Sequence, residues 1–126
     1  MSSETGLGRI SADVLDRLLA DTGTDHALVT FVLRAYQDRA PELLTGLQEA
    51  VAEGDGRGAA QHAHDLASTS GQVGALGISR LAGEIEVLGE RGDGTLAEPS
   101  ARIAAALPEA LAELRRIAEG YESSSR

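Results

Sequence analysis

The sequence contains no cysteine and no lysine, few aromatic residues and no long apolar run. Without cysteine the chain can form no disulfide, no thiolate nucleophile and no cysteine-ligated zinc site. Aromatic residues make up 2% of a chain that is 42% hydrophobic, so the core must consist mainly of aliphatic side chains. Leucine and alanine are strong helix formers, and this composition favours an all-α protein.

Negative charge predominates, with a formal net charge of −9 at pH 7 over 126 residues. Nucleic acids and anionic membranes are polyanions that this charge repels, so we expect neither as a partner. The N-terminal stretch "MSSETGLGRI" lacks the basic start and the apolar segment of a secretory signal. We therefore expect a cytoplasmic protein, and the length favours a single domain.

Apolar residues recur at helical spacing in five segments, and none shows the alternation of a strand. The predicted helices begin after the N-cap Ser11, at Thr24, at about Arg57, at Leu76 and at Ser100, and the fourth of them is expected to end at about Arg91. Pro41 and Pro108 fall inside the second and the last of these segments, where we expect kinks. The pattern predicts an antiparallel four-helix bundle with an additional short N-terminal helix. This bundle is expected to cover residues 10–120, between flexible tails at 1–9 and 121–126.

The third predicted helix contains the stretch "AHDLASTSGQVGA" (63–75), in which small residues surround His64. On a helix, His64 lies one step off the inward-facing stripe, at the border between buried and exposed positions. The residues of this stripe are Ala59, Ala63, Leu66, Ser70 and Val73. A shelf of small residues would leave its imidazole ring open to another macromolecule, although a chain rich in alanine and glycine gives such a pattern by chance as well. The residues of this shelf are Ala60, Ala67, Ser68 and Gly71.

The other two histidines give no metal site by their spacing. His62 lies about 200° around the helix from His64, so the two rings cannot chelate one ion from a regular helix. His26 falls in the first turn of the second predicted helix and is most simply a surface residue. The sequence shows no Ser-His-Asp grouping and no phosphate-binding glycine loop. We therefore expect no metal site, no ATP binding and no autonomous enzyme.

The stretch around His64 resembles the histidine phosphotransfer (HPt) domain of bacterial phosphorelays. The family pattern is approximately A-H-x-L-K-G-S-S-x-x-[ILVF]-G-A, and from Ala63 to Ala75 it reads A-H-x-L-A-S-T-S-x-x-V-G-A here. The segment "PELLTGLQEAVAEGD" (41–55) is similar to the second helix of the family and its Gly-Asp stop. The resemblance covers roughly residues 10 to 120 and implies a four-helix bundle with an exposed, phosphorylated histidine.

The resemblance implies that His64 accepts a phosphoryl group from the aspartate of a response-regulator receiver domain, or from a kinase, and passes it on. The partner would supply Mg²⁺, so no cofactor is expected in this chain. Glu86, 22 residues after His64, stands where the histidine-orienting Glu or Gln stands in members such as chemotaxis kinases. By this interpretation the protein is a monomeric phosphocarrier and not an enzyme.

Two positions depart from the family pattern. The lysine three residues after the histidine is Ala67, and the glycine four residues after it is Ser68. Ser68 could crowd the phosphoryl group or donate a hydrogen bond to it. Arg57 lies two turns before His64 on nearly the same face, and it is the cation that the sequence places near the phosphoryl group. Gly71 is expected in the same phosphoryl environment.

Receiver docking is expected through the second, third and fourth predicted helices around His64. The expected contact residues are Ala60, Gln61, Ala67, Ser68 and Gly71.

Three functions remain open on the sequence. The first is a phosphate-carrying HPt protein, and the second is a degenerate HPt-like module that binds a receiver or a kinase without phosphotransfer, which Ala67 and Ser68 motivate. The third is an unrelated helical adaptor, which an exposed His64 within hydrogen-bond distance of Glu86 would exclude. A sensor kinase's dimerisation domain fits less well. Its histidine is normally followed by Glu or Asp and, a few residues later, by proline, whereas here "LASTSG" follows Asp65.

Overall fold

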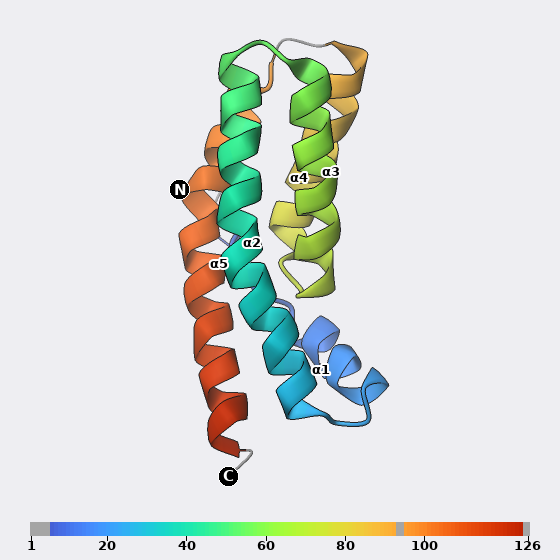
Figure 1. Cartoon of the computed structure of the whole chain (residues 1–126), viewed down its shortest axis with the longest axis vertical. Coiled ribbons are helices and arrows are strands. Elements are labelled where there is room, and N and C mark those ends of the chain that lie inside the picture. The colour runs from blue at the N-terminus through green and yellow to red at the C-terminus, as the bar shows by residue number, and fades with distance from the viewer. Residues whose placement is uncertain (1–5, 93–94, 125–126) are drawn as a thin grey trace.

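The computed structural model describes residues 6–92 and 95–124, which contain five helices and no strand (Figure 1). The helices are α1 (Ala12–Asp21), α2 (His26–Ala52), α3 (Gly56–Gln72), α4 (Leu76–Arg91) and α5 (Ala97–Ser124). The predicted all-α class is therefore confirmed, as is the predicted extent of α4.

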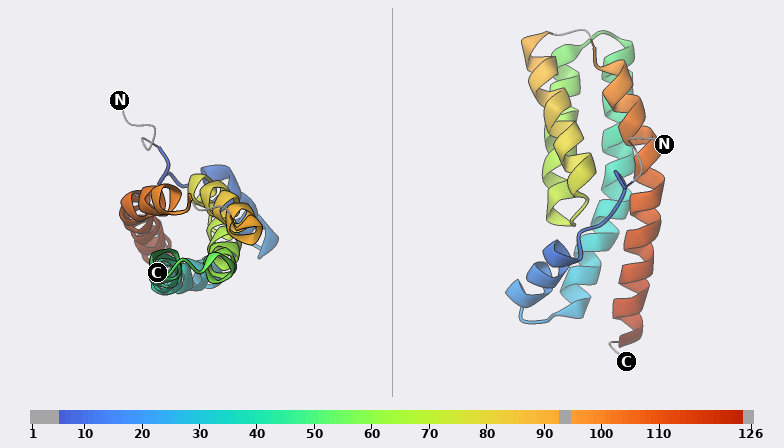
Figure 2. Two further views of the ribbon diagram at one scale, coloured as in Figure 1. Left: turned by 90° about the horizontal axis from the view of Figure 1, so that it is seen from above. Right: turned by 180° about the vertical axis from the view of Figure 1, so that it is seen from behind.

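Helices α2 to α5 form the antiparallel bundle, and Figure 2 shows the four of them around a common centre when viewed from above. α2 and α5 are the longest helices and extend beyond the lower ends of α3 and α4. The short α1 lies beside α2 at this lower end. The expected bundle with one additional N-terminal helix is therefore present.

Side-chain caps determine where the helices begin. The carboxylate of Asp25 accepts a hydrogen bond from the N–H of Leu28 at 3.0 Å, and Thr24 before it has a positive φ of 64°. α2 therefore begins one residue after this cap and not at Thr24. Asp55 caps α3 in the same way, so that helix begins at Gly56. The predicted N-cap Ser11 is confirmed by the hydrogen bond that its hydroxyl accepts within α1.

The last helix is longer at both ends than predicted. It begins at Ala97, and Ser100, the expected first residue, is buried inside it. At the other end it continues through Ser124, so the expected tail from residue 121 is helical as far as the structure describes it. The ring of Tyr121 meets that of His26 edge to face at a centroid distance of 5.0 Å, and this contact anchors the last turns of α5 to α2.

The described part of the expected N-terminal tail also packs against the bundle. Leu7 contacts the hydrophobic core. Gly8 lies so close to α5 that a Cβ on it would be 2.6 Å from the carbonyl oxygen of Ala106. Residues 6–9 are therefore part of the packed structure, and residues 1–5 of the expected tail lie outside the described residues, as do 125 and 126.

The core consists of aliphatic side chains, as the composition predicts. Its large, fully buried members come from all four bundle helices: Leu33, Leu43, Leu47, Leu66, Ile78, Ile85, Ile103 and Leu114. The predicted inner stripe of α3 is buried as well, from Ala59 through Val73. Each fully buried leucine or isoleucine contributes about 1.5–3 kcal/mol to folding, and this burial fixes which face of α3 remains in solvent.

Candidate functional site

His64 lies in the middle of α3 with 63% of its side chain exposed. Its neighbours Ala63 and Leu66 are fully buried. The ring therefore stands at the border between the core and the solvent, as the helical pattern predicts. This position gives a partner access to the imidazole while the helix beneath it is held by the core.

Glu86 of α4 reaches the ring of His64. The Nδ1 atom of His64 and the Oε2 atom of Glu86 lie 3.0 Å apart, and 28% of the glutamate side chain is exposed. An ionised carboxylate can only accept a hydrogen bond, so this contact requires the proton on Nδ1, and the N–H donates a hydrogen bond to Glu86. In the neutral ring the other nitrogen, Nε2, then keeps its lone pair. In this arrangement the ring is hydrogen-bonded through Nδ1, and Nε2 is the nitrogen that does not face Glu86.

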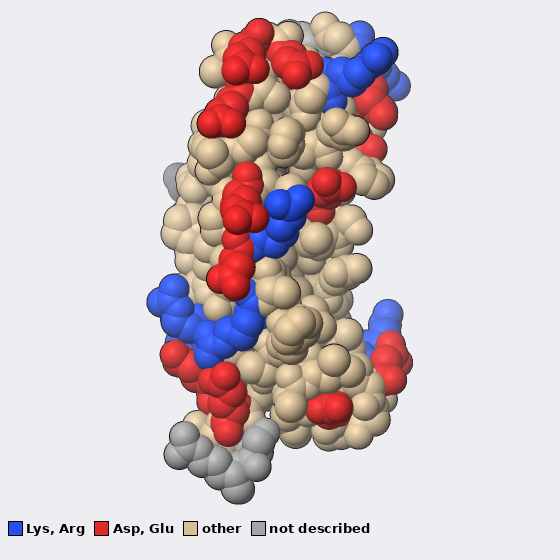
Figure 3. All heavy atoms as spheres, in the orientation of Figure 1, with Lys and Arg blue, Asp and Glu red and all other residues tan. Residues whose placement is uncertain are grey.

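An open groove lies beside this pair, between the start of α3 and the end of α4. Its polar lining comes from both helices: Arg57, Gln61, His64, Glu86, Glu90 and Arg91. Figure 3 shows arginine atoms gathered at the upper right of the molecule, where these two helix ends lie. The groove therefore combines the histidine with two guanidinium groups, which attract anions, and with two carboxylates, which repel them.

Arg57 lines this groove, as the sequence predicts, but Arg91 was not expected there. Arg91 follows Glu86 by five residues at the end of α4. In an antiparallel helix pair the end of one helix lies beside the start of the other, so a residue late in α4 meets the residues early in α3. The signal that could have identified Arg91 was this pairing, not its spacing from His64 along the chain.

Ala60 does not lie on an exposed docking surface, contrary to the sequence prediction. It is 4% exposed because Gly89 of α4 lies directly against it. Helical spacing placed Ala60 on the same face as His64, one turn earlier, but at that point the face is covered by α4. Ala60 therefore forms part of the floor of the groove. Gln61 beside it is exposed.

The remaining shelf residues follow His64 along α3. Ser68 is exposed, and Ala67 is half-buried with its carbonyl oxygen accepting a hydrogen bond from Ser79 Oγ at 2.7 Å. Gly71 lies two turns beyond His64 and does not line the groove that His64 and Glu86 share. It lines a second hollow instead.

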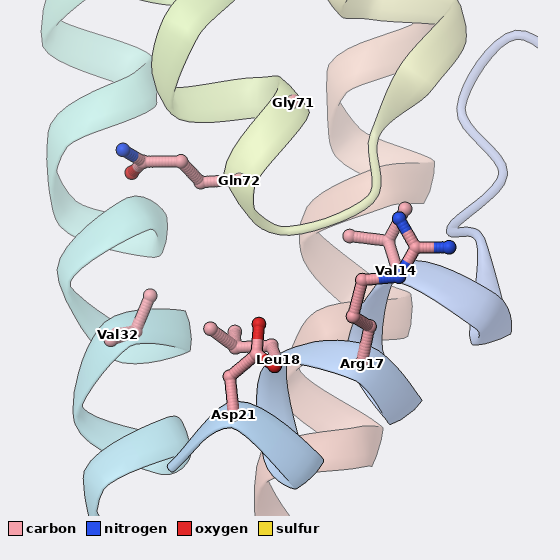
Figure 4. A pocket seen from close by; sticks show the side chains of 7 residues that line it. All are labelled: Val14, Arg17, Leu18, Asp21, Val32, Gly71 and Gln72. Carbon is pink, nitrogen blue, oxygen red and sulfur yellow. The ribbon is translucent and has the colours of Figure 1, made fainter.

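This second hollow lies between α1, α2 and the end of α3, as Figure 4 shows. Val14 and Leu18 of α1 and Val32 of α2 give it an apolar wall, and Arg17 and Asp21 add charged groups from α1. Gly71 therefore lines this hollow and not the groove beside His64, and its expected place in the phosphoryl environment stays a prediction.

The other two histidines are held by packing contacts. The Nδ1 atom of His62 lies 2.9 Å from the carbonyl oxygen of Gly58, and its ring covers Gly46, where a Cβ would be 2.4 Å away. His26, which we expected at the surface, is half-buried, and its ring packs against that of Tyr121. Among the described residues, no three metal-ligating side chains gather at one place.

The fold and the site define a class: a helical bundle with an exposed histidine whose Nδ1 atom lies within hydrogen-bond distance of a carboxylate from the neighbouring helix. The model of the Hpt domain family matches residues 32–117, and the chain belongs to this family. Its function is histidine phosphotransfer in a phosphorelay. Hpt domains are phosphocarriers that interact with receiver domains and histidine kinases, and membership of this family excludes the unrelated helical adaptor.

A solved structure shows the same fold. The histidine-containing phosphotransfer protein B (HptB) of Pseudomonas aeruginosa PAO1 matches with a TM-score of 0.72 and 22% sequence identity, over 93% of this chain and 96% of that chain. No protein of curated function matches the sequence significantly. Within the residues that the structure describes, no helix is both long enough and apolar enough to span a membrane.

Proposed function

We propose that His64 is the phosphoryl acceptor and that it carries the group on Nε2, with Glu86 as the residue that orients the ring. The observation that carries this proposal is the 3.0 Å contact between Nδ1 of His64 and the Glu86 carboxylate, made while 63% of the His64 side chain is exposed. Of the two ring nitrogens, only Nε2 then has a lone pair for attack. His62 and His26 are packed against other groups and offer no comparable geometry.

The transfer joins Nε2 to the phosphorus of a receiver's phosphoaspartate. As the nitrogen lone pair forms the N–P bond, the P–O bond to the aspartate breaks and the aspartate leaves as a carboxylate. The ring keeps its proton on Nδ1 and becomes cationic, and the carboxylate of Glu86 faces this developing charge. The reverse step returns the phosphoryl group to a receiver. Mg²⁺ in the partner's active site neutralises phosphoryl charge, so this chain needs no cofactor of its own.

Arg57 and Arg91 supply positive charge on the groove side of His64. They line the same groove as the histidine, whereas the family's lysine position is occupied by Ala67. Arginine is always charged and matches the oxygens of a phosphoryl group geometrically. The exposed Ser68 can donate a hydrogen bond to the same group from the other side of His64. These three side chains therefore take the place of the usual lysine and glycine in our proposal.

The docking surface for a receiver or a kinase consists of the exposed residues on both sides of His64. Gln61 and Ser68 are exposed, Ala67 is half-exposed, and the surface continues along α3 to Gly71 at the second hollow. Small side chains along this face let the partner's active site approach the ring. The protein acts as a monomer in the cytoplasm.

Phosphotransfer from partners of the same genome tests the proposal. Receiver domains charged with acetyl phosphate, or autophosphorylated kinases, are incubated with the wild type and with His64→Gln. His26→Gln is the matched control, because it makes the same change far from the groove. We expect acid-labile label on the wild type and on the control and none on His64→Gln.

A wild type that binds a receiver but stays unlabelled with every receiver and kinase would overturn this proposal. That result would support the degenerate module that docks without phosphotransfer.

A further inference from the structure

α3 and α4 approach each other very closely at a pair of glycines. Gly56 is the first residue of α3, and Gly89 lies in the last turn of α4. A Cβ on Gly89 would be 2.5 Å from the carbonyl oxygen of Gly56 and 3.2 Å from the Cβ of Ala60. Ordinary contact begins at 3.4 Å, so a side chain at Gly89 would push the two helices apart.

On α4 this contact lies one helical turn from Glu86, and on α3 it extends from Gly56, about two turns before His64, to Ala60, one turn before it. Gly89 follows Glu86 by three residues, and Ala60 precedes His64 by four, which places each beside its partner on the same helix face. Beyond His64, the hydrogen bond from Ser79 Oγ to the carbonyl oxygen of Ala67 joins the two helices again. His64 and Glu86 therefore lie between two places at which α3 and α4 are in contact, and these contacts fix the distance between the two side chains.

We propose that Gly89 is a positioning residue for phosphotransfer: its lack of a side chain lets α4 lie against α3, which brings Glu86 within hydrogen-bond distance of His64. This inference rests on the proposed roles of His64 and Glu86. A methyl group at Gly89 would lie about 0.9 Å closer to the Gly56 carbonyl oxygen than ordinary contact allows. A comparable lengthening of the 3.0 Å bond between His64 and Glu86 exceeds the range of a hydrogen bond.

The chain offers a matched control and a graded variant. Gly83 also lies inside α4, but a Cβ there would meet nothing within 4 Å. Gly83→Ala therefore changes the same helix by the same methyl group without separating it from α3. At Gly56 a Cβ would be 2.9 Å from the carbonyl oxygen of Gly89, a milder clash than the 2.5 Å at Gly89. The expected order of effect is Gly89→Ala, then Gly56→Ala, then Gly83→Ala with none.

The direct readout is the tautomer of His64, measured by long-range ¹H–¹⁵N NMR of histidine-labelled protein. We expect the wild type and Gly83→Ala to show the proton on Nδ1 of the neutral ring. Gly89→Ala should show a mixture in which Nε2 carries the proton in part of the molecules, and Gly56→Ala a smaller shift. Because Nε2–H cannot attack phosphorus and the ring is misplaced, the phosphotransfer rate of Gly89→Ala should fall about 10- to 100-fold.

The double variant Gly83→Ala/Gly89→Ala repeats the measurement with higher helix propensity, in case Gly89→Ala alone does not fold. A folded variant with alanine at residue 89 that keeps the wild-type tautomer and rate would overturn the positioning role. The tautomer is read without any phosphoryl donor. A wild type that accepts no phosphate would therefore refute the proposed function and leave this test intact.

Discussion

The two helix pairs of the bundle differ in length and in how closely their backbones approach each other. α2 and α5, with 27 and 28 residues, bury large aliphatic side chains such as Leu33, Leu47 and Leu114. α3 and α4, with 17 and 16 residues, meet through Gly56 and Gly89 at the end that carries the groove. Large side chains remove more apolar surface from water, whereas glycine lets two backbones approach. Both pairs therefore contribute to stability, and we propose that the close approach of the short pair sets the geometry of the site.

The largest expected effect is on stability and comes from the long pair. Leu114→Ala removes a fully buried side chain of α5 and should lower the free energy of unfolding by about 2–5 kcal/mol. Urea denaturation measures this loss. If the two pairs have separate roles, the protein that remains folded keeps the wild-type tautomer of His64. A shift of the tautomer in this variant would show that the site geometry depends on the long pair as well.

A smaller effect is expected where the two pairs are joined. The hydroxyls of Tyr36 in α2 and Ser70 in α3 form a buried hydrogen bond of 2.8 Å. Tyr36→Phe leaves the hydroxyl of Ser70 without this partner and should lower the free energy of unfolding by about 1–3 kcal/mol. The double variant Tyr36→Phe/Ser70→Ala removes both groups and should be less destabilised than the two single changes combined. Additive losses would show that the bond contributes little.

The same bond gives a pH dependence with a definite sign. Burial raises the pKa of Tyr36 above its ordinary value of 10.0, and the hydrogen bond from Ser70 offsets this only in part. Above pH 10 the unfolded chain loses the tyrosine proton while the folded chain keeps it, so stability falls until the pH passes the folded pKa. Thermal unfolding between pH 9 and 12 should show a shallower fall for Tyr36→Phe than for the wild type, with pH points chosen at roughly one-unit spacing.

A stabilising change is expected in the short pair. Gly83 lies inside α4 with open space around its Cα atom, and alanine has a higher helix propensity by up to about 1 kcal/mol. Gly83→Ala should raise the melting temperature and leave phosphotransfer unchanged. A loss of phosphotransfer with intact folding would mean that α4 needs flexibility at residue 83, which contradicts a purely geometric role for this helix.

The smallest effect is expected at the surface of the long pair. Arg34 of α2 and Glu122 of α5 form an ion pair of 2.8 Å, with 37% and 51% of the side chains exposed. Solvent screens such a pair, so Glu122→Gln should change the free energy of unfolding by about 0–1 kcal/mol, and less at high salt. Denaturation at low and at high ionic strength measures both values. A larger loss would mean that surface charge, and not apolar burial, holds α2 and α5 together.

The helix content could be predicted from the sequence because it depends on local properties. The aliphatic composition and the helical spacing of apolar residues predict the bundle, and the inner stripe of α3 from Ala59 to Val73 is buried as expected. Helix ends were less predictable. α5 extends to Ser124 because Tyr121 packs against His26, a contact between residues far apart in the chain.

The site was predictable only where it lies within one helix. The exposure of His64 follows from its place beside the apolar stripe, and the position of Glu86 came from the family resemblance rather than from spacing. The burial of Ala60 and the presence of Arg91 in the groove depend on how α4 lies against α3. That register is set by backbone contacts between Gly56 and Gly89, which no pattern within one helix shows.

The measurement that tests the central claim most directly is the position of phosphorus on the phosphorylated protein, read by long-range ¹H–¹⁵N and ³¹P NMR. We predict a phosphohistidine at residue 64 with phosphorus on Nε2 and the proton on Nδ1, facing Glu86. Phosphorus on Nδ1 of His64, or on His26 or His62, would contradict the account.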